Sequence, residues 1–360
     1  MISVRYGSKA EHNAQILTGI NLLTNGQCEI SNCEDSTLPP CIVLMEYNGK
    51  KIAFDTCDGY FHENAIATDC RYAQLGIEIL FKRDFSKRDN EKIDCRCVSY
   101  VCKGGGQNMD LYPLGLNYYC YDRRIEKIYF YDWKRRIKHS IKKLCGMDFD
   151  AHWKNFENKK SRKKYSCDVL FLTRLWNPES EEVENPDIIQ DRIEINQMRI
   201  NIIKALREKY GDAAICGVYD DDYARKTVPE LIVTSFTDKK KYINVMKNAK
   251  VVISSLGLHK SNGWKFGEYF AAGKAIVAEK PYYDVPYAEA QTNWLEYKTV
   301  DECLENVERL LSDSNKRKNM EQCNKSFYEK HGRPDRLIYD ALQKTKWIEE
   351  WKQLEIGSKF

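Results

Sequence analysis

Residues 251–280 constrain the fold more than any other part of the chain. They read VVISSLGLHKSNGWKFGEYFAAGKAIVAEK, in which two apolar runs flank a polar loop and a helix-like segment. Val251 to Ser255 is short and β-branched, as buried parallel strands are. Trp264 to Ala272 has the pattern of a helix, and Ala275 to Ala278 repeats the strand pattern. The stretch therefore predicts one βαβ unit of an α/β fold.

The polar loop before the predicted helix carries groups that suit an anionic ligand. Ser261 or Asn262 can cap the helix by accepting a hydrogen bond from a backbone N–H. A helix start offers unpaired N–H groups and the positive end of a dipole, which together favour phosphate. Lys260 and Lys265 add positive charge, and Glu268 can accept hydrogen bonds from hydroxyl groups such as those of a ribose.

The segment GWKFGEYFAAGKAIVAEK resembles the nucleotide-sugar loop and helix of GT-B glycosyltransferases, of the family 1 and family 4 type found in bacterial polysaccharide synthesis. The related segment has a glutamate, a helix of small residues, Gly-Lys/Thr-Pro and a strand. The resemblance implies that Glu268 holds the ribose of the donor. Many retaining members have an acidic residue eight positions earlier, where this sequence has Lys260, so retention and inversion both stay open.

The resemblance also implies a fold class and a division of the chain. The fold would be α/β and GT-B-like, with two Rossmann-like doubly wound domains facing a cleft and a C-terminal helix crossing back to the first domain. Residues 1–160 would form the acceptor-side domain and residues 161–335 the domain that binds the nucleotide sugar. Residues 336–360 would be the returning helix.

The implied function is transfer of a sugar from a nucleotide-diphosphate sugar to a glycan or lipid-linked acceptor. Neither a metal nor another cofactor is expected, because fixed dipoles and cations would take up the charge of the leaving diphosphate. Two other functions stay open. One is a nucleotide-sugar epimerase on the same fold, and the other is a non-catalytic protein that binds a sugar or a membrane.

The donor-binding candidates extend beyond the central loop. Asp168 to Thr173 is a compact apolar run, and Arg174 follows at its carboxyl end, where ligands bind in doubly wound sheets. The resemblance places an arginine there against the donor diphosphate; the lysine that usually follows is absent, so Lys265 or Lys260 would supply the second cation. The next predicted strand ends at residues 217–219, where a nucleotide base could stack. The donor-binding candidates are Arg174, Gly217, Tyr219, Gly257, Lys260, Ser261, Asn262, Gly263, Lys265 and Glu268.

The acceptor-side candidates follow a predicted hairpin. Cys41 to Asp55 contains two apolar runs around Asn48-Gly49, a strong hairpin signal because both turn residues tolerate positive φ. An inverting enzyme needs a base that takes the proton of the acceptor hydroxyl. Asp55, Asp58 and His62 are the candidates in the polar cluster after the hairpin, with His12 behind them. An Asp-Gly turn with a helix cap is the alternative role for this cluster.

Composition narrows the partners and the location. The 360 residues suffice for two domains, and a net charge of +4 gives little support to nucleic-acid binding. The 14 cysteines lack the spacing of zinc ligands and fit core packing in a reducing cytoplasm. The N-terminus lacks an apolar signal, and no stretch reaches the ~18 apolar residues of a membrane span.

A basic segment leaves a peripheral membrane contact open. From Trp133 to Lys143, apolar residues recur at helical spacing and basic residues fill the other faces. A basic amphipathic helix of this kind either lies on the anionic inner face of a membrane or packs on a domain core with its charges in water. The expected location is therefore cytoplasmic, with contact at the membrane inner face as the alternative.

The remaining elements follow from apolar periodicity. We expect strands over residues 2–5, 77–81, 213–218 and 231–234, and helices ending at residue 23 and over residues 187–210, 238–248, 301–311, 315–330 and 335–354.

Overall fold

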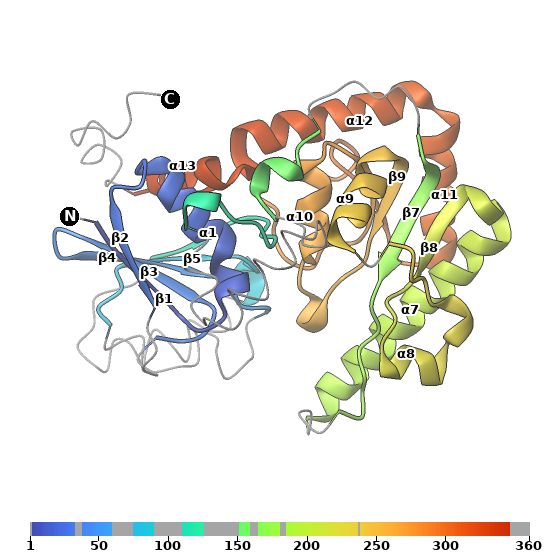
Figure 1. Cartoon of the computed structure of the whole chain (residues 1–360), viewed down its shortest axis with the longest axis horizontal. Helices are drawn as coiled ribbons and strands as arrows, with labels where there is room; N and C mark the ends of the chain where they lie inside the picture. The colour runs from blue at the N-terminus through green and yellow to red at the C-terminus, as the bar shows by residue number, and fades with distance from the viewer. Residues whose placement is uncertain are drawn as a thin grey trace, which may run out of the picture. The chain divides into compact units, whose positions relative to one another are not determined.

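The computed structural model describes residues 2–32, 38–59, 75–89, 110–125, 151–158, 165–180, 185–236 and 238–345. The chain forms two compact units (Figure 1). The first contains Met1–Trp153, Tyr283–Pro286 and Glu329–Phe360, and the second contains Lys154–Tyr282 and Tyr287–Tyr328. Each unit is an α/β structure with its own sheet and its own apolar core, which confirms the predicted class.

The sheet of the first unit has the strand order β2-β1-β3-β4-β5-β6. Its strands are β1 (Ile2–Tyr6), β2 (Cys28–Asn32), β3 (Ile42–Tyr47), β4 (Lys50–Asp55), β5 (Ile79–Lys82) and β6 (Asp110–Pro113). Neighbouring strands run parallel except at β3, which is antiparallel to both β1 and β4. The sheet is therefore mixed, a departure from the parallel Rossmann-like sheet that the resemblance implies.

The physical reason for this departure is the predicted hairpin. Asn48 and Gly49 have φ values of +49° and +76° and join β3 to β4 directly. A two-residue turn of this kind can only link antiparallel strands.

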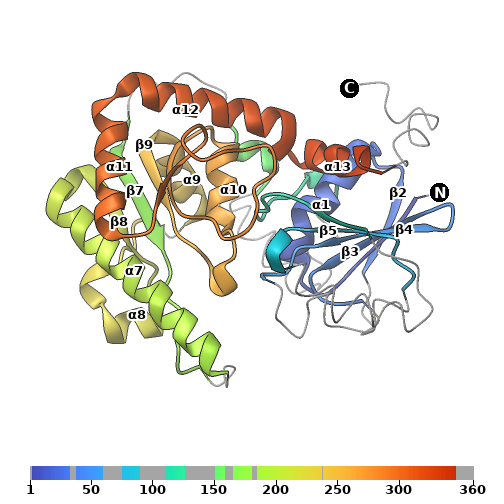
Figure 2. The ribbon, with the colours of Figure 1, turned by 180° about the vertical axis from the view of Figure 1, so that it is seen from behind.

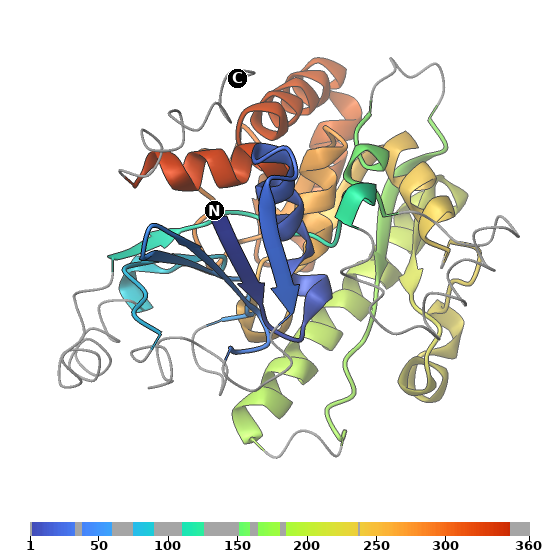
Figure 3. The ribbon, with the colours of Figure 1, turned by 60° about the vertical axis from the view of Figure 1, so that its left-hand side comes forward.

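The last described helix belongs to the first unit, as the resemblance implies. Helix α13 (Pro334–Gln343) begins at a proline and packs against α1 (Ala10–Leu23) (Figures 2 and 3). Their approach is close at Gly19, where a Cβ would lie 2.1 Å from the backbone oxygen of Pro334 and 2.6 Å from Cγ1 of Ile338. No larger residue fits there without moving one helix.

The second unit is doubly wound, as predicted. Its sheet is entirely parallel, in the order β11-β10-β9-β7-β8. The strands are β7 (Cys167–Thr173), β8 (Ala214–Val218), β9 (Ala249–Ser254), β10 (Ala275–Glu279) and β11 (Leu295–Tyr297). The helices are α7 (Pro186–Tyr210), α8 (Asp222–Thr227), α9 (Lys239–Asn248), α10 (Trp264–Ala271), α11 (Val300–Ser312) and α12 (Ser314–Phe327). Helices α7 and α11 lie on one face of the sheet, and α9, α10 and α12 lie on the other (Figures 1 and 2).

Two local predictions in this unit are wrong. The strand expected over residues 231–234 is a 3-10 turn at Pro229–Leu231 followed by one isolated bridge from Ile232 to Val218, because Pro229 starts the turn. Helix α10 is capped by Gly263 without a side-chain hydrogen bond. Ser261 is instead held in the loop, since its N–H donates to Leu258 O and its carbonyl accepts from Gly257 N.

Some predictions fall on parts that the structure leaves out. The basic segment from Trp133 to Lys143, the candidate base His62 and the chain after residue 345 lie outside the described residues. Among the helices that are described, none is long and apolar enough to cross a membrane.

Candidate functional site

The carboxyl ends of β7 and β9 form the point at which the second sheet changes direction. The chain goes from β7 to β8 on one side and later from β9 to β10 and β11 on the other. In open α/β sheets, ligands bind at such a switch point because the loops on either side turn away from each other. Arg174 follows β7 there, and Ser255 and Leu256 follow β9.

Arg199 links these two strand ends by hydrogen bonds. It lies on α7, is only 5 % exposed, and donates to Arg174 O at 2.7 Å, Leu256 O at 2.7 Å and Ser255 Oγ at 3.0 Å. These hydrogen bonds go to neutral oxygens and do not neutralise its positive charge, although the charge of Glu279 also acts on it. Burial lowers the pKa of Arg199 to about 10, and it stays charged at neutral pH. A positive charge is thus held in a fixed position at the switch point.

The loop after β9 is held in one shape by backbone contacts. Gly257 N donates to Ser261 O at 2.8 Å, and a Cβ on Gly257 would lie 2.5 Å from Ser261 Oγ. His259 N donates to Asp191 at 2.8 Å. His259 and Lys260 both have φ of +59°, a left-handed conformation that costs non-glycine residues free energy.

The first turn of α10 adds a second cation. Lys265 is half-buried, with its Nζ 4.4 Å from the centre of the Tyr242 ring on α9. Burial is the main cause that lowers the pKa of Lys265 to about 8; the nearby positive charges of Lys239, Arg199 and Arg174 lower it further, and Glu268 raises it.

Glu268 is almost enclosed, with a residue exposure of 2 %. One carboxylate oxygen, Oε1, accepts from Lys239 Nζ at 2.5 Å, and Oε2 has no hydrogen-bond partner among the described residues. Burial above all, and then Tyr269 and Glu268, raise the pKa of the Tyr242 hydroxyl well above its usual value, so this hydroxyl keeps its proton at neutral pH. The carboxylate is thus anchored at one oxygen and unsatisfied at the other.

The other predicted donor-binding residues differ in how far they are exposed to solvent. Arg174 is exposed, with its guanidinium 5.2 Å from the centre of the Trp176 ring. Lys260 is exposed, 5.2 Å from the centre of the Tyr282 ring. Ser261 and Asn262 are buried in the loop.

Gly217 and Tyr219 lie at the end of β8. A Cβ on Gly217 would be 2.3 Å from Val233 Cγ2 and 2.6 Å from Leu231 O, so this glycine is required by packing. Tyr219 is 46 % exposed, and its N–H donates to Thr173 O at 2.8 Å. A ring with that exposure is accessible to a planar ligand.

Sequence reasoning missed Arg199 and Lys239. Arg199 has a signal, because it is a charged residue on the face of α7 that otherwise carries Ile202, Ile203 and Leu206. Lys239 has no such signal. It stands among several lysines at the start of α9, and only the folded structure shows that it is the one that meets Glu268.

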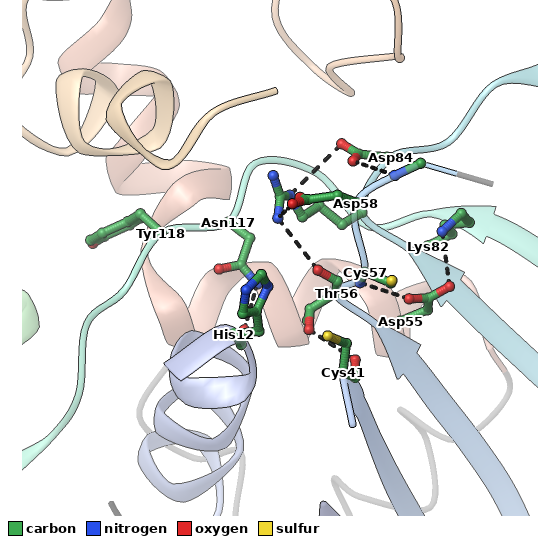
Figure 4. A network of polar contacts seen from close by, with 12 residues as sticks. His12, Cys41, Asp55, Thr56, Cys57, Asp58, Lys82, Asp84, Asn117 and Tyr118 are labelled. Carbon is green, nitrogen blue, oxygen red and sulfur yellow. Dashed lines mark hydrogen bonds and ion pairs between the residues drawn. The ribbon is translucent and has the colours of Figure 1, made fainter. Parts of the chain in front are cut away.

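The first unit contains a second polar cluster, drawn in Figure 4. Asp55 is fully buried, and its carboxylate accepts from Lys82 Nζ at 2.9 Å and from Cys57 N at 2.8 Å. Lys82 is itself 2 % exposed. A carboxylate enclosed in this way cannot reach an acceptor hydroxyl without leaving its partners.

Arg83 holds the other acidic residues of this cluster. Its guanidinium lies 2.9 Å from Asp58 Oδ1 and 3.7 Å from Asp84 Oδ1. Asp84 is buried and accepts from Gly59 N at 3.0 Å, and burial raises its pKa to about 6. The Asp58 side chain is 31 % exposed, which makes it the accessible carboxylate of the three.

His12, at the start of α1, faces the same cluster in Figure 4. Burial is the main cause that lowers its pKa, opposed by Asp58 and assisted by Arg83. His12 is therefore neutral at pH 7 and able to accept a proton.

Comparison with known proteins gives structural likenesses only. No family model and no curated protein matches the sequence. Among solved structures, this chain is similar to WaaG, a glycosyltransferase involved in lipopolysaccharide biosynthesis, with 10 % identity, a TM-score of 0.42 and coverage of 95 % of this chain and 98 % of that one. It is also similar to Anabaena Alr3699/HepE in complex with UDP, with 12 % identity, a TM-score of 0.40 and coverage of 80 % and 71 %.

A third likeness is to the C-terminal domain of a glycosyl transferase group 1 family protein, LpcC, from Francisella tularensis. It has 14 % identity and a TM-score of 0.36, and covers 49 % of this chain and 95 % of that one. These identities and TM-scores are low, so a function for this chain has to rest on its own residues.

Proposed function

We propose that this protein is a glycosyltransferase that binds a nucleotide-diphosphate sugar at the carboxyl ends of β7 and β9. The observation that carries the proposal is the position of Arg174 and the buried Arg199 at the ends of β7 and β9, with Lys265 and the enclosed carboxylate of Glu268 on α10, the helix that follows the loop after β9. A diphosphate would meet the cations, and Glu268 would accept from the ribose hydroxyls. This division matches the roles that the sequence resemblance implies for Arg174 and Glu268.

The cations also suit the chemistry of transfer. When the bond between the sugar and the diphosphate breaks, negative charge grows on the diphosphate oxygen. Fixed cations and the N–H groups at the start of α10 stabilise that charge without having to reorient. The proposed reaction for this reason needs no metal.

On the acceptor side, the proposed groups are Asp58 and His12. An acceptor hydroxyl that attacks the sugar must lose its proton to a base. Asp58 is partly exposed, and the lowered pKa of His12 keeps its ring neutral and ready to take a proton. A glycan or lipid-linked acceptor and a cytoplasmic location, with contact at the membrane inner face, are supported by the resemblance alone.

The test is thermal stability and nucleotide release over a panel of nucleotide sugars. A ligand that binds only the folded state raises the melting temperature. We expect one donor to raise it in the wild type, with a much smaller rise in Arg174→Ala and Glu268→Ala. Lys241→Met is the matched control, because Lys241 is an exposed lysine two residues from Lys239 on α9.

Three outcomes separate the alternatives. Release of nucleotide with transfer of the sugar to an acceptor supports the proposal. A bound donor whose sugar is isomerised and not transferred indicates the epimerase. No shift with any donor, from protein shown to be folded, contradicts the proposal and favours a protein that binds something else.

A further inference from the structure

The stretch that follows β7 is attached to helix α7 on both sides of Leu175. Before it, Arg174 O accepts from Arg199 Nη1 at 2.7 Å. After it, Trp176 N donates to Asn196 Oδ1 at 2.8 Å, and Trp176 O accepts from Asn196 Nδ2 at 2.7 Å. Asn196 is only 4 % exposed, so these two hydrogen bonds are shielded from water. One buried amide thus pairs with both polar backbone groups of Trp176.

The residues of α7 that hold this stretch lie on one face of the helix. Arg192, Asn196 and Arg199 are spaced as i, i+4 and i+7, which makes them neighbours on a helix surface. Arg192 continues the attachment along the stretch, since its Nη1 donates to Asn177 O and to Ser180 Oγ. The backbone after β7 is therefore fixed by a row of hydrogen bonds from a single helix.

This attachment decides which side chains of the stretch face outward. Leu175 is 3 % exposed and belongs to the apolar core of the second unit, whereas Arg174 is exposed and Trp176 is partly exposed. Arg174 and Trp176 share the outer side, because Cζ of Arg174 lies 5.2 Å from the centre of the Trp176 ring. Among the described residues no carboxylate forms a salt bridge with Arg174, so its charge is available to an anion.

An aromatic ring in contact with a guanidinium restricts a side chain that would otherwise sample many rotamers. Arginine loses rotamer entropy when a ligand immobilises it, and this loss weakens binding. Contact with an aromatic face reduces the loss, and it leaves the in-plane N–H donors available to phosphate oxygens. The ring can do this only if it is itself held, and Asn196 holds the backbone that carries it.

We propose that Trp176 is a positioning residue that holds the Arg174 guanidinium in place for the diphosphate of the donor. Trp176 acts through its contact with the guanidinium and does not touch the donor itself. This inference rests on the proposed function, because it takes the donor diphosphate as the ligand of Arg174.

The experiment is calorimetric titration with the nucleotide sugar that gives the largest thermal shift in the panel. A second titrant is the nucleoside diphosphate of the same base, which carries the diphosphate without the sugar. Trp176→Leu removes the ring and should weaken binding of both titrants about fivefold, the size of an exposed cation–π contact. Trp176→Phe keeps an aromatic face and should bind within about twofold of the wild type.

A double-mutant cycle separates positioning from direct contact. If Trp176 acts only through Arg174, the double variant Arg174→Ala/Trp176→Leu should bind no more weakly than Arg174→Ala alone. The melting temperature of each free variant shows that it is folded.

Tyr210→Leu is the matched control. Tyr210 is another partly exposed ring beside a cation, with Lys209 Nζ 5.5 Å from its centre. It ends α7 shortly before β8 begins, at the edge of the sheet opposite to the strand ends that carry the site. Removing its ring should leave the binding of both titrants as in the wild type.

The outcomes keep the two proposals apart. The inference is overturned, and the glycosyltransferase proposal stands, if Trp176→Leu binds as the wild type does or if its loss persists in the Arg174→Ala background. A loss confined to the nucleotide sugar also overturns it, since the ring would then contact the sugar. A loss of equal size in Tyr210→Leu does so too, because the effect would not be specific to Arg174. Failure of the folded wild type to bind any nucleotide sugar overturns both proposals.

Discussion

Each unit contains two cations that are removed from water at least in part, but the partners of these cations differ. They are Lys82 and Arg83 in the first unit, and Arg199 and Lys265 in the second. Lys82 meets Asp55, and Arg83 meets Asp58 and Asp84, so each positive charge of the first cluster faces a carboxylate. Arg199 donates its hydrogen bonds to neutral oxygens, and the carboxylates of Glu279 and Asp191 act on its charge without being among these acceptors. Lys265 lies among three other cations and one carboxylate.

In the first cluster the protein itself supplies the negative charges that balance its cations, whereas in the second a bound anion would supply part of them. Buried charges persist when they are paired and hydrogen-bonded, and the first cluster meets this condition within the protein. The second keeps an excess of positive charge around a strand-end switch point. An arrangement of that kind is stabilised when an anion binds.

The largest effect should come from breaking the paired cluster. Asp55→Ala leaves the Lys82 ammonium buried without its partner and should cost about 3–5 kcal/mol of unfolding free energy. Urea unfolding measures the loss, and hydrogen exchange of β4 and β5 locates it. The double variant Asp55→Ala/Lys82→Met should lose less than the single one, because no buried charge is left unpaired. A loss below about 1 kcal/mol in the single variant would show that the pair is not buried as described.

Removing Arg199 should have an intermediate effect on stability. Arg199→Met takes away the donors to Arg174 O, Leu256 O and Ser255 Oγ, which join two strand ends. We expect a loss of about 1–3 kcal/mol, together with weaker nucleotide-sugar binding. Arg199→Lys is the control for charge, since it keeps the cation but cannot reach all three oxygens. If both variants bind as the wild type does, the fixed cation has no part in the site.

Arg174→Ala should barely change stability. Its side chain is exposed and stacks on Trp176, so the unfolding free energy should stay within about 0.5 kcal/mol of the wild type. Binding of the nucleotide sugar should nevertheless fall at least about tenfold, in keeping with the loss of a charge-assisted contact. A variant that loses stability and binding in equal measure would mean that Arg174 supports the fold rather than the ligand.

Salt should have the smallest effect on stability, and it should act differently on the two clusters. Raising the salt concentration to about 1 M shortens the range of electrostatic interactions to about 3 Å, which weakens ligand binding at the half-exposed cations. Buried pairs are screened much less, so the cost of Asp55→Ala should change little. Calorimetry and urea unfolding at low and high salt measure the two quantities. Equal salt dependence in both clusters would remove the distinction between them.

Much of the fold can be predicted from local sequence. The βαβ pattern of residues 251–280 appears as β9, α10 and β10, and the Asn48-Gly49 signal appears as the β3–β4 hairpin. These features depend on side-chain periodicity and on backbone conformations that few residues adopt, and both are visible in short stretches. The position of Arg174 at a strand end was predictable for the same reason.

Other local features could not be predicted from propensity. The cap of α10 is Gly263, because Ser261 forms backbone hydrogen bonds with Leu258 and Gly257 inside the preceding loop. Helix α13 approaches α1 closely because Gly19 has no side chain, a fit that involves residues distant in the sequence.

What the sequence by itself determined was the α/β class of each unit, most of the strands and helices of the second, with α8 and β11 missed and a strand wrongly expected over residues 231–234, and the presence of cations near its central loop. Only the tertiary structure decided which charges meet. Asp55 pairs with a lysine 27 residues away, and Glu268 with one of several lysines near the start of α9, 29 residues away. Periodicity shows which face of an element is buried, but a charge is balanced or left over according to distances in space, and those are fixed when the strands and helices pack.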